Sequence, residues 1–195
     1  MSITDIRPLK AKRREKYRTI RHNVTAELRT AADVKIAERV RNLQQYQKCE
    51  ILLTYVSTDI EVDTLRIIEN ALCDGKRVAV PRCIPGTRNM EFYCISSLAE
   101  LKPGAFGVLE PEATGDRLVS GAISTLCIVP ALGYDRCGYR LGYGKGYYDR
   151  YLANFDGDII GICYSNCVQR SLPHGRYDRR VSLLVTEKYI RRTGI

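Results

Sequence analysis

One short segment combines backbone freedom, fixed charge, aromatic rings and a carboxylate; it reads RLGYGKGYYDR, from Arg140 to Arg150. Glycines alternate along it, at Gly142, Gly144 and Gly146. Residues without a Cβ let backbone N–H groups approach a phosphate closely, and Arg140 and Lys145 add full positive charges. Asp149 can hold a magnesium ion, directly or through water. The pattern predicts a phosphate-binding segment; the alternative is a tight glycine-rich connection whose charges face solvent.

Spacing excludes two familiar phosphate-binding motifs. A P-loop needs G-x-x-x-x-G-K-[ST], but Lys145 is followed by Gly146 and Tyr147. The dinucleotide fingerprint G-x-G-x-x-G does not fit either, because here the glycines follow one another as G-x-G-x-G. The underlying physics remains available, since a helix beginning near Gly146 would add its positive N-terminal end.

The chain has 195 residues and a net charge of +9. Its length and apolar content predict one domain, residues 1–195, with a sizeable core. No window holds the ~18 apolar residues of a membrane span, and the first residues lack the apolar run of a secretory signal. We therefore expect a cytoplasmic protein without a membrane partner, and a monomer. The charge predicts anionic partners; Lys10 to Arg21, KAKRREKYRTIR, holds seven basic residues and one acid.

The eight cysteines predict neither a disulfide framework nor a zinc site. Nothing indicates export to an oxidising compartment. No C-x-x-C pair exists, and His22 and His174 lie far from any cysteine cluster in the sequence. Cys127 and Cys163 stand in apolar runs and are expected in the core. Cys137 is either a reactive thiol among cations or, as we expect, an incidental loop residue.

Helices and buried strands alternate along the chain. A long first helix is predicted from the apolar stripe Tyr17, Ile20, Val24 and Leu28, a second from Ile36, Val40 and Leu43, and others over 62–72 and from Gly146 onward. Strands are predicted at 50–56, at 77–81 where Pro81 stops the strand, and at 90–95, 126–130, 158–164 and 181–186.

This alternation is typical of a three-layer α/β domain with a mainly parallel central sheet. In such sheets, ligands bind beyond the carboxyl ends of the strands. The segment RLGYGKGYYDR follows the strand at 126–130 and precedes a helix, so its position suits a binding site. The irregular segment 96–120 is long enough to predict a functional loop.

A longer pattern around the glycines resembles a known family. The run VPALGYDRCGYRLGYGKGYYDRYL, residues 129–152, is similar to the signature of the 5-formyltetrahydrofolate cyclo-ligases, also called methenyltetrahydrofolate synthetases. The N-terminal K-x-x-x-R pattern recurs as Lys10 and Arg14, STDIEVDT places Glu61 at the family's substrate-binding glutamate, and FGVLEP resembles the loop that carries an aromatic residue, Phe106, over the folate. The family fold is a three-layer α/β domain, which agrees with the strand and helix pattern.

The resemblance implies the conversion of 5-formyltetrahydrofolate to 5,10-methenyltetrahydrofolate, with ATP becoming ADP and phosphate. The formyl oxygen is a very poor leaving group. Its phosphorylation by ATP would give an iminium phosphate, from which phosphate leaves readily when nitrogen N10 attacks. The substrate supplies the nucleophile, so the protein needs no nucleophilic Ser, Cys or His; its work is positioning and electrostatic stabilisation. ATP, Mg²⁺ and a reduced folate are the implied ligands.

The resemblance also implies roles for individual residues. It implies ATP binding by Lys10, Arg14, Arg140, Gly142, Gly144, Lys145, Gly146, Tyr148 and Asp149, catalysis by Lys145, Arg140 and Tyr147, folate binding by Val56, Glu61, Phe106 and Tyr147, and magnesium binding by Asp149. Simpler explanations stand beside these. Lys10 and Arg14 can solvate a helix face, Tyr148 can pack in the core, and Glu61 can complement a helix dipole.

One departure and two alternatives remain. Where the family carries D-x-x-V-D near the C-terminus, this chain has Asp178 but Ser182, so one implied magnesium ligand is missing. Magnesium usually keeps several waters, so Asp149 or Asp178 can suffice. The first alternative is a nucleic-acid-binding protein that uses the basic N-terminal helix. The second is an inactive or related ATP-using paralogue of the same fold.

Overall fold

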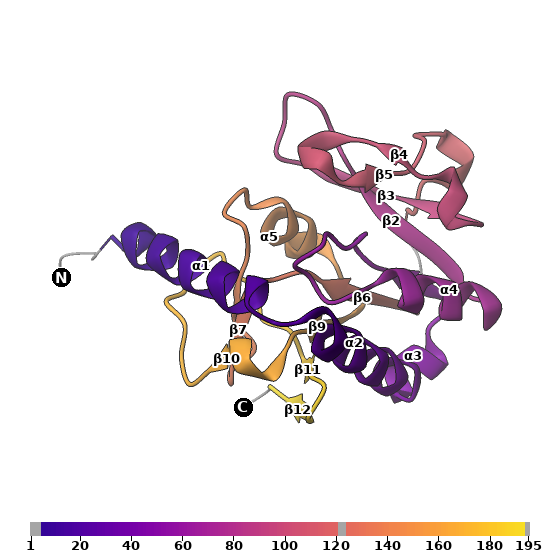
Figure 1. The fold of residues 1–195 in the computed structure, drawn as a ribbon. Coiled ribbons are helices and arrows are strands. Elements are labelled where there is room, and N and C mark those ends of the chain that lie inside the picture. Colours follow the sequence, from indigo (N-terminus) through magenta and orange to yellow (C-terminus); the bar gives the residue numbers. More distant parts are fainter. Residues whose placement is uncertain (1–4, 121–123, 194–195) are drawn as a thin grey trace.

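The computed structural model describes residues 5–120 and 124–193, and the side chain of Phe106 is not among the described parts. A seven-stranded sheet runs in the order β12-β11-β9-β6-β1-β2-β3 (Figure 1). Its strands are β1 (Ile51–Leu53), β2 (Arg77–Cys83), β3 (Met90–Ile95), β6 (Thr125–Val129), β9 (Asp158–Ile162), β11 (Leu183–Val185) and β12 (Ile190–Arg192). The inner pairs are parallel and the outermost pairs, β2–β3 and β11–β12, are antiparallel. The predicted mainly parallel α/β fold is confirmed.

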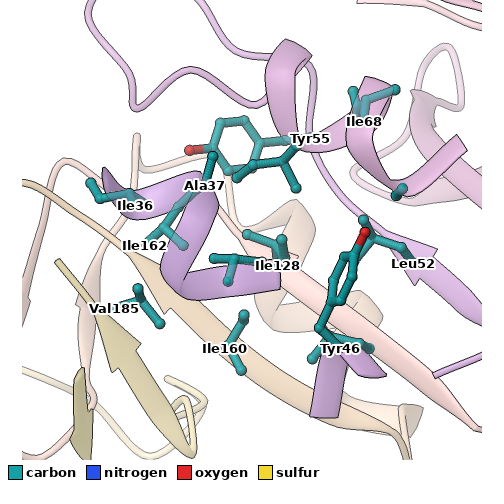
Figure 2. Close-up of a cluster of buried hydrophobic side chains, with 14 of the residues drawn as sticks. Ile36, Ala37, Tyr46, Leu52, Tyr55, Ile68, Ile128, Ile160, Ile162 and Val185 are labelled. Carbon is teal, nitrogen blue, oxygen red and sulfur yellow. The ribbon is translucent and has the colours of Figure 1, made fainter. Parts of the chain in front are cut away.

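Successive residues of the inner strands point into two separate cores, as strand geometry requires. Leu52 and Ile128 belong to one buried cluster, whereas Leu53 and Val129 belong to the other. Figure 2 shows the first cluster, where Ile36 and its neighbours meet side chains of the central strands. The helices are α1 (Arg7–His22), α2 (Ala26–Arg41), α3 (Gln44–Lys48), α4 (Leu65–Cys73) and α5 (Tyr147–Tyr151). Buried residues of α2, α3 and α4 enter the first cluster, while Tyr17 of α1 enters the second.

The predicted single first helix is wrong in its extent. Helix α1 ends at His22, and Thr25 begins α2 by accepting a hydrogen bond from the backbone N–H of Leu28 at 3.4 Å. Leu28 was expected on the apolar stripe but is 65% exposed. A threonine cap restarts the helix in a new direction, so the helical period does not carry across the break.

The prediction that Pro81 stops its strand is also wrong. Strand β2 continues to Cys83, and Pro81 lies opposite Phe92 of β3. On the other side of β2, the pairing with β1 ends at Ala79. Pro81 therefore lies where that side has no strand partner, which is the position a strand proline tolerates.

Short elements that the sequence pattern did not predict complete the fold. A second sheet joins β10 (Val168–Gln169), β7 (Gly133–Asp135) and β8 (Arg140–Leu141), and a two-stranded sheet joins β4 (Lys102–Pro103) to β5 (Leu109–Glu110). The turns are 3₁₀ helices: η1 (Leu98–Glu100), η2 (Ala105–Gly107), η3 (Gly115–Arg117), η4 (Leu152–Asn154) and η5 (Ser165–Cys167). The segment 96–120 thus carries short structure, and β4 and β5 lie near β2 and β3 at one end of the molecule (Figure 1). Among the described residues, no helix is long and apolar enough to cross a membrane.

The order of the strands reverses between β1 and β6. From β1 the chain passes through α4 to β2 on one side, while β6, β9 and β11 follow one another on the other side. A ligand crevice is expected outside the carboxyl ends of two such strands. A site is therefore expected in the loops that leave β1 and β6.

Candidate functional site

The loop after β1 and the glycine segment after β8 meet through a direct side-chain bond. Glu61 lies in the loop that leaves β1, and Tyr143 lies in the glycine segment that follows β8. The hydroxyl of Tyr143 donates to Glu61 Oε1 at 2.7 Å, across 82 residues of sequence. Two regions that the sequence singled out separately are thus brought together at the switch point.

The Glu61 carboxylate is buried and held by three donors. Glu61 is 7% exposed. Its Oε2 accepts hydrogen bonds from the backbone N–H of Thr58 at 2.9 Å and from the Thr58 hydroxyl at 3.0 Å. A buried carboxylate needs such donors because it lacks water. Val56, in the same loop, is buried and packs in the first core cluster.

The glycine segment adopts a conformation that side chains disfavour. Gly144 has φ +97° and Gly146 has φ +78°, both in the left-handed region. Arg14 of α1 lies against this segment: its Nε donates to the Gly142 carbonyl at 2.8 Å, and its guanidinium carbon is 3.2 Å from where a Cβ on Gly144 would stand. Burial, and then the neighbouring Arg18, lower the pKa of Arg14. One predicted phosphate ligand therefore already lies beside the predicted phosphate loop.

Lys10 lies on the same side of α1 as Arg14 but has a carboxylate partner. Its Nζ is 2.6 Å from Asp178 Oδ2, and both side chains are mostly buried. The same oxygen accepts from the backbone N–H of Gly175 at 2.7 Å. This arrangement ties the first turns of α1 to the loop before β11.

Arg140 faces inward to a carboxylate. Its side chain is 5% exposed. One terminal guanidinium nitrogen donates to the Arg179 carbonyl at 2.8 Å, and the other lies 2.5 Å from Asp149 Oδ1. Asp149 is about one-third exposed. The alternative that the charges of this segment simply face solvent therefore does not hold for Arg140.

The described residues contain no cluster of three or more His, Cys, Asp or Glu side chains that could hold a metal ion. Asp149 is a single partly exposed carboxylate, and the hydroxyl of Ser182 donates to the Ile159 carbonyl at 2.9 Å. One carboxylate together with substrate phosphates and water fits magnesium, which is seldom enclosed by protein ligands alone.

The remaining predicted residues surround the same segment. Tyr147 begins α5, and its hydroxyl donates to the Thr87 carbonyl at 3.3 Å. Tyr148 packs against both core clusters, while its buried hydroxyl has no hydrogen-bond partner among the described residues, and burial raises its pKa. Lys145 is exposed. Phe106 lies in η2, and its side chain falls outside the described parts.

Helix α5 is shorter than the glycine pattern predicted. It spans five residues before the 3₁₀ turn η4, so the contribution of a helix dipole to phosphate binding is smaller than expected. A separate hollow of about 690 Å³, lined by Leu53, Met90, Tyr151 and Phe155 among others, contains none of the predicted site residues.

Sequence reasoning did not assign a role to Arg21. This arginine is 1% exposed; it donates to the Ile60 carbonyl at 3.0 Å and to the Ala131 carbonyl at 2.5 Å. These carbonyls belong to the loops after β1 and β6, so Arg21 joins both walls of the site. Arg21 lies one helical turn after the buried Tyr17, and this spacing could have indicated that Arg21 is buried as well. A charged residue, however, is normally expected to face solvent.

Comparisons with known proteins agree with the fold. The model of the 5-formyltetrahydrofolate cyclo-ligase family matches residues 7–187. The "Probable 5-formyltetrahydrofolate cyclo-ligase" of Schizosaccharomyces pombe is 30% identical over 175 residues, covering 81% of this chain and 85% of the relative. The 5-formyltetrahydrofolate cyclo-ligase of Haemophilus influenzae is 27% identical over 169 residues, covering 85% and 90%. The NMR structure of the 5,10-methenyltetrahydrofolate synthetase of Aquifex aeolicus superposes with a TM-score of 0.83 at 33% identity, covering 95% of this chain and 93% of that one.

Proposed function

Since the chain belongs to the 5-formyltetrahydrofolate cyclo-ligase family, we propose that it converts 5-formyltetrahydrofolate to 5,10-methenyltetrahydrofolate with consumption of ATP. The observation that carries this proposal is the family match over residues 7–187. Family membership favours an enzyme over the nucleic-acid-binding alternative, because the basic residues of α1 then serve an anionic nucleotide.

In the proposed reaction, the formyl oxygen of the substrate attacks the γ-phosphorus of ATP and ADP leaves. The resulting carbon carries a phosphate in place of a poor leaving group. Nitrogen N10 then attacks that carbon, the C–O bond breaks, and phosphate departs with the former formyl oxygen. The N10 proton passes to phosphate or water, and the methenyl cation remains. Atoms and charge balance without a protein nucleophile.

The contribution of the protein is electrostatic. Arg14 lies against the glycine segment, and we assign to it and to Lys145 the neutralisation of the triphosphate. Lys10 joins them when a phosphate competes with Asp178 for its ammonium. The backbone N–H groups of the glycine segment add donors. Such preorganised groups act on charge that develops in the transition state.

Asp149 is the proposed magnesium ligand, with ATP oxygens and water completing the coordination. Magnesium would neutralise phosphate charge during transfer. Arg140, which holds the Asp149 carboxylate, is then better assigned to orienting this ligand than to touching phosphate directly. Glu61, Val56, Phe106 and Tyr147 stay the predicted folate-binding residues. A monomer in the cytoplasm also stays a prediction.

The test is optical. The purified protein is mixed with 5-formyltetrahydrofolate, ATP and Mg²⁺, and the absorbance of the methenyl product is followed, with ATP omitted as the control. ATP-dependent product formation is expected. A folded protein that forms no product would defeat the proposal, and salt-sensitive RNA binding by that protein would favour the nucleic-acid alternative.

A further inference from the structure

Tyr143 completes the Glu61 site from the opposite loop. Resting on the proposed function, we propose that Tyr143 is a displaceable stand-in for the folate: in the ligand-free protein its hydroxyl occupies the Glu61 oxygen that N–H donors of the pterin ring take when the substrate binds. Tyr143 is thereby a specificity-determining residue that favours ligands able to donate hydrogen bonds.

The three donors to Glu61 differ in origin. Both bonds to Oε2 come from Thr58, three residues away in the same loop. They fix the carboxylate from within its own turn. The bond to Oε1 comes from Tyr143, on a loop 82 residues further along the chain. Oε1 is therefore the oxygen whose partner can leave without unfolding the turn that holds Glu61.

Glycine flanks Tyr143 on either side, which gives this segment the backbone freedom to adopt a second conformation. Gly142 has no atom within 4 Å of the place where a Cβ would stand, and Gly144 is in the left-handed region. Tyr143 is 38% exposed, whereas Glu61 is 7% exposed. In the proposed exchange the tyrosine ring swings outward from the carboxylate into solvent, and the flanking glycines supply the backbone freedom.

The exchange is chemically matched. A carboxylate only accepts hydrogen bonds, and a phenol hydroxyl can donate one. Burial, and then the nearby Glu61 charge, raise the pKa of Tyr143, so its hydroxyl keeps its proton. The 2-amino group and ring N–H of a reduced pterin are donors of the same kind. Replacing one donor by another leaves Glu61 satisfied in both states, whereas a ligand without a donor would leave a buried oxygen unpaired.

The deciding measurement is the equilibrium affinity for 5-formyltetrahydrofolate without nucleotide, by calorimetric titration. In Tyr143→Phe the ring stays and the competing hydroxyl is gone, so the Kd should fall by about tenfold, the scale of one hydrogen bond to a charged group. Tyr46→Phe is the matched control. It removes a tyrosine hydroxyl that donates to Asp74 Oδ2 at 2.7 Å, away from Glu61, and should leave the Kd unchanged.

An unchanged or higher Kd in folded Tyr143→Phe overturns the inference, because the hydroxyl then does not compete with substrate. Tyr143→Leu, which also lacks the hydroxyl, is the second variant should Tyr143→Phe fail to fold, and its Kd should likewise fall. A wild-type chain that neither binds the folate nor forms product overturns the proposed function and this inference together. A wild-type chain that forms product, with variants that bind no tighter, overturns this inference alone.

Discussion

Asp149→Ala should destabilise the ligand-free protein strongly, because it leaves the buried charge of Arg140 without its carboxylate partner. The Arg140 side chain is 5% exposed, and its described partners are the Asp149 carboxylate and the Arg179 carbonyl. Removing one partner of a buried ion pair costs about 3–5 kcal/mol. For a chain of this length each kcal/mol lowers the melting temperature by about 2–4 °C. The expected loss is therefore about 6–20 °C.

The reverse substitution should cost less. Asp149 is about one-third exposed, so Arg140→Met leaves a carboxylate that water can solvate, and a long apolar side chain fills the buried space. Asp149→Asn keeps an acceptor oxygen for Arg140 and should fall between Asp149→Ala and the wild type. The order of these variants, and not one value alone, reports that the buried partner is the arginine.

Scanning calorimetry without ATP or Mg²⁺ measures these shifts. Asp5→Ala is the control, because the pair that Asp5 forms with Arg7 is exposed: 87% of the Arg7 side chain and 50% of the Asp5 side chain are accessible. This variant should melt within about 2 °C of the wild type. The reasoning is refuted if Asp149→Ala melts like Asp5→Ala, or if Arg140→Met is less stable than Asp149→Ala.

Three further outcomes are expected. Gly144→Ala forces a side chain into a left-handed backbone beside Arg14, a cost of about 1–3 kcal/mol, so the KM for ATP should rise about tenfold or more. Gly115→Ala is the control: Gly115 lies outside the site and has no atom within 4 Å of an added Cβ, so this variant should stay near wild type. Lys145→Ala should raise the barrier by ~2–4 kcal/mol, seen as a fall in kcat; unchanged turnover removes Lys145 from the mechanism. A hydrogen bond from the Cys163 thiol lowers the pKa of Cys167. The native state therefore releases this proton at a lower pH than the unfolded chain, whose thiol pKa is about 8.5, so the free energy of unfolding should rise as the pH approaches about 8.5 from below. In urea titrations Cys167→Ala should lose that rise, and an identical pH slope in both proteins would contradict the assignment.

The sequence was most informative where local chemistry decides the structure. Alternating apolar runs predicted the sheet, and the strand at 90–95 has the predicted bounds. The glycine segment was predicted as a special backbone, and Gly144 and Gly146 do have positive φ. Local pattern failed at Leu28 and Pro81, where a helix cap and the end of a neighbouring strand override the period.

Contacts between distant segments were beyond the reach of the pattern. Lys10 meets Asp178 across 168 residues, and Tyr143 meets Glu61 across 82. Arg140 seemed a phosphate ligand by its place in the motif, but its burial against Asp149 is a property of the folded chain. Charge and spacing in the sequence identify the candidate site residues. Which of them pair with each other depends on how distant segments of the chain approach in the fold.

The spacing of residues along α1 has a mechanical consequence. Lys10, Arg14, Tyr17 and Arg21 form one stripe, whose last two members are rooted in the protein interior and whose first two reach the glycine loop and Asp178. The buried Tyr17 and Arg21 fix the C-terminal part of the helix, and this sets the positions of Lys10 and Arg14. An inserted residue between Arg14 and Tyr17 would rotate the N-terminal part of the helix by about 100° relative to the rest. Lys10 and Arg14 would then turn away from the proposed nucleotide site while Tyr17 and Arg21 stay in place. Insertions or deletions in this helix should therefore be far less tolerated than substitutions of its solvent-facing residues.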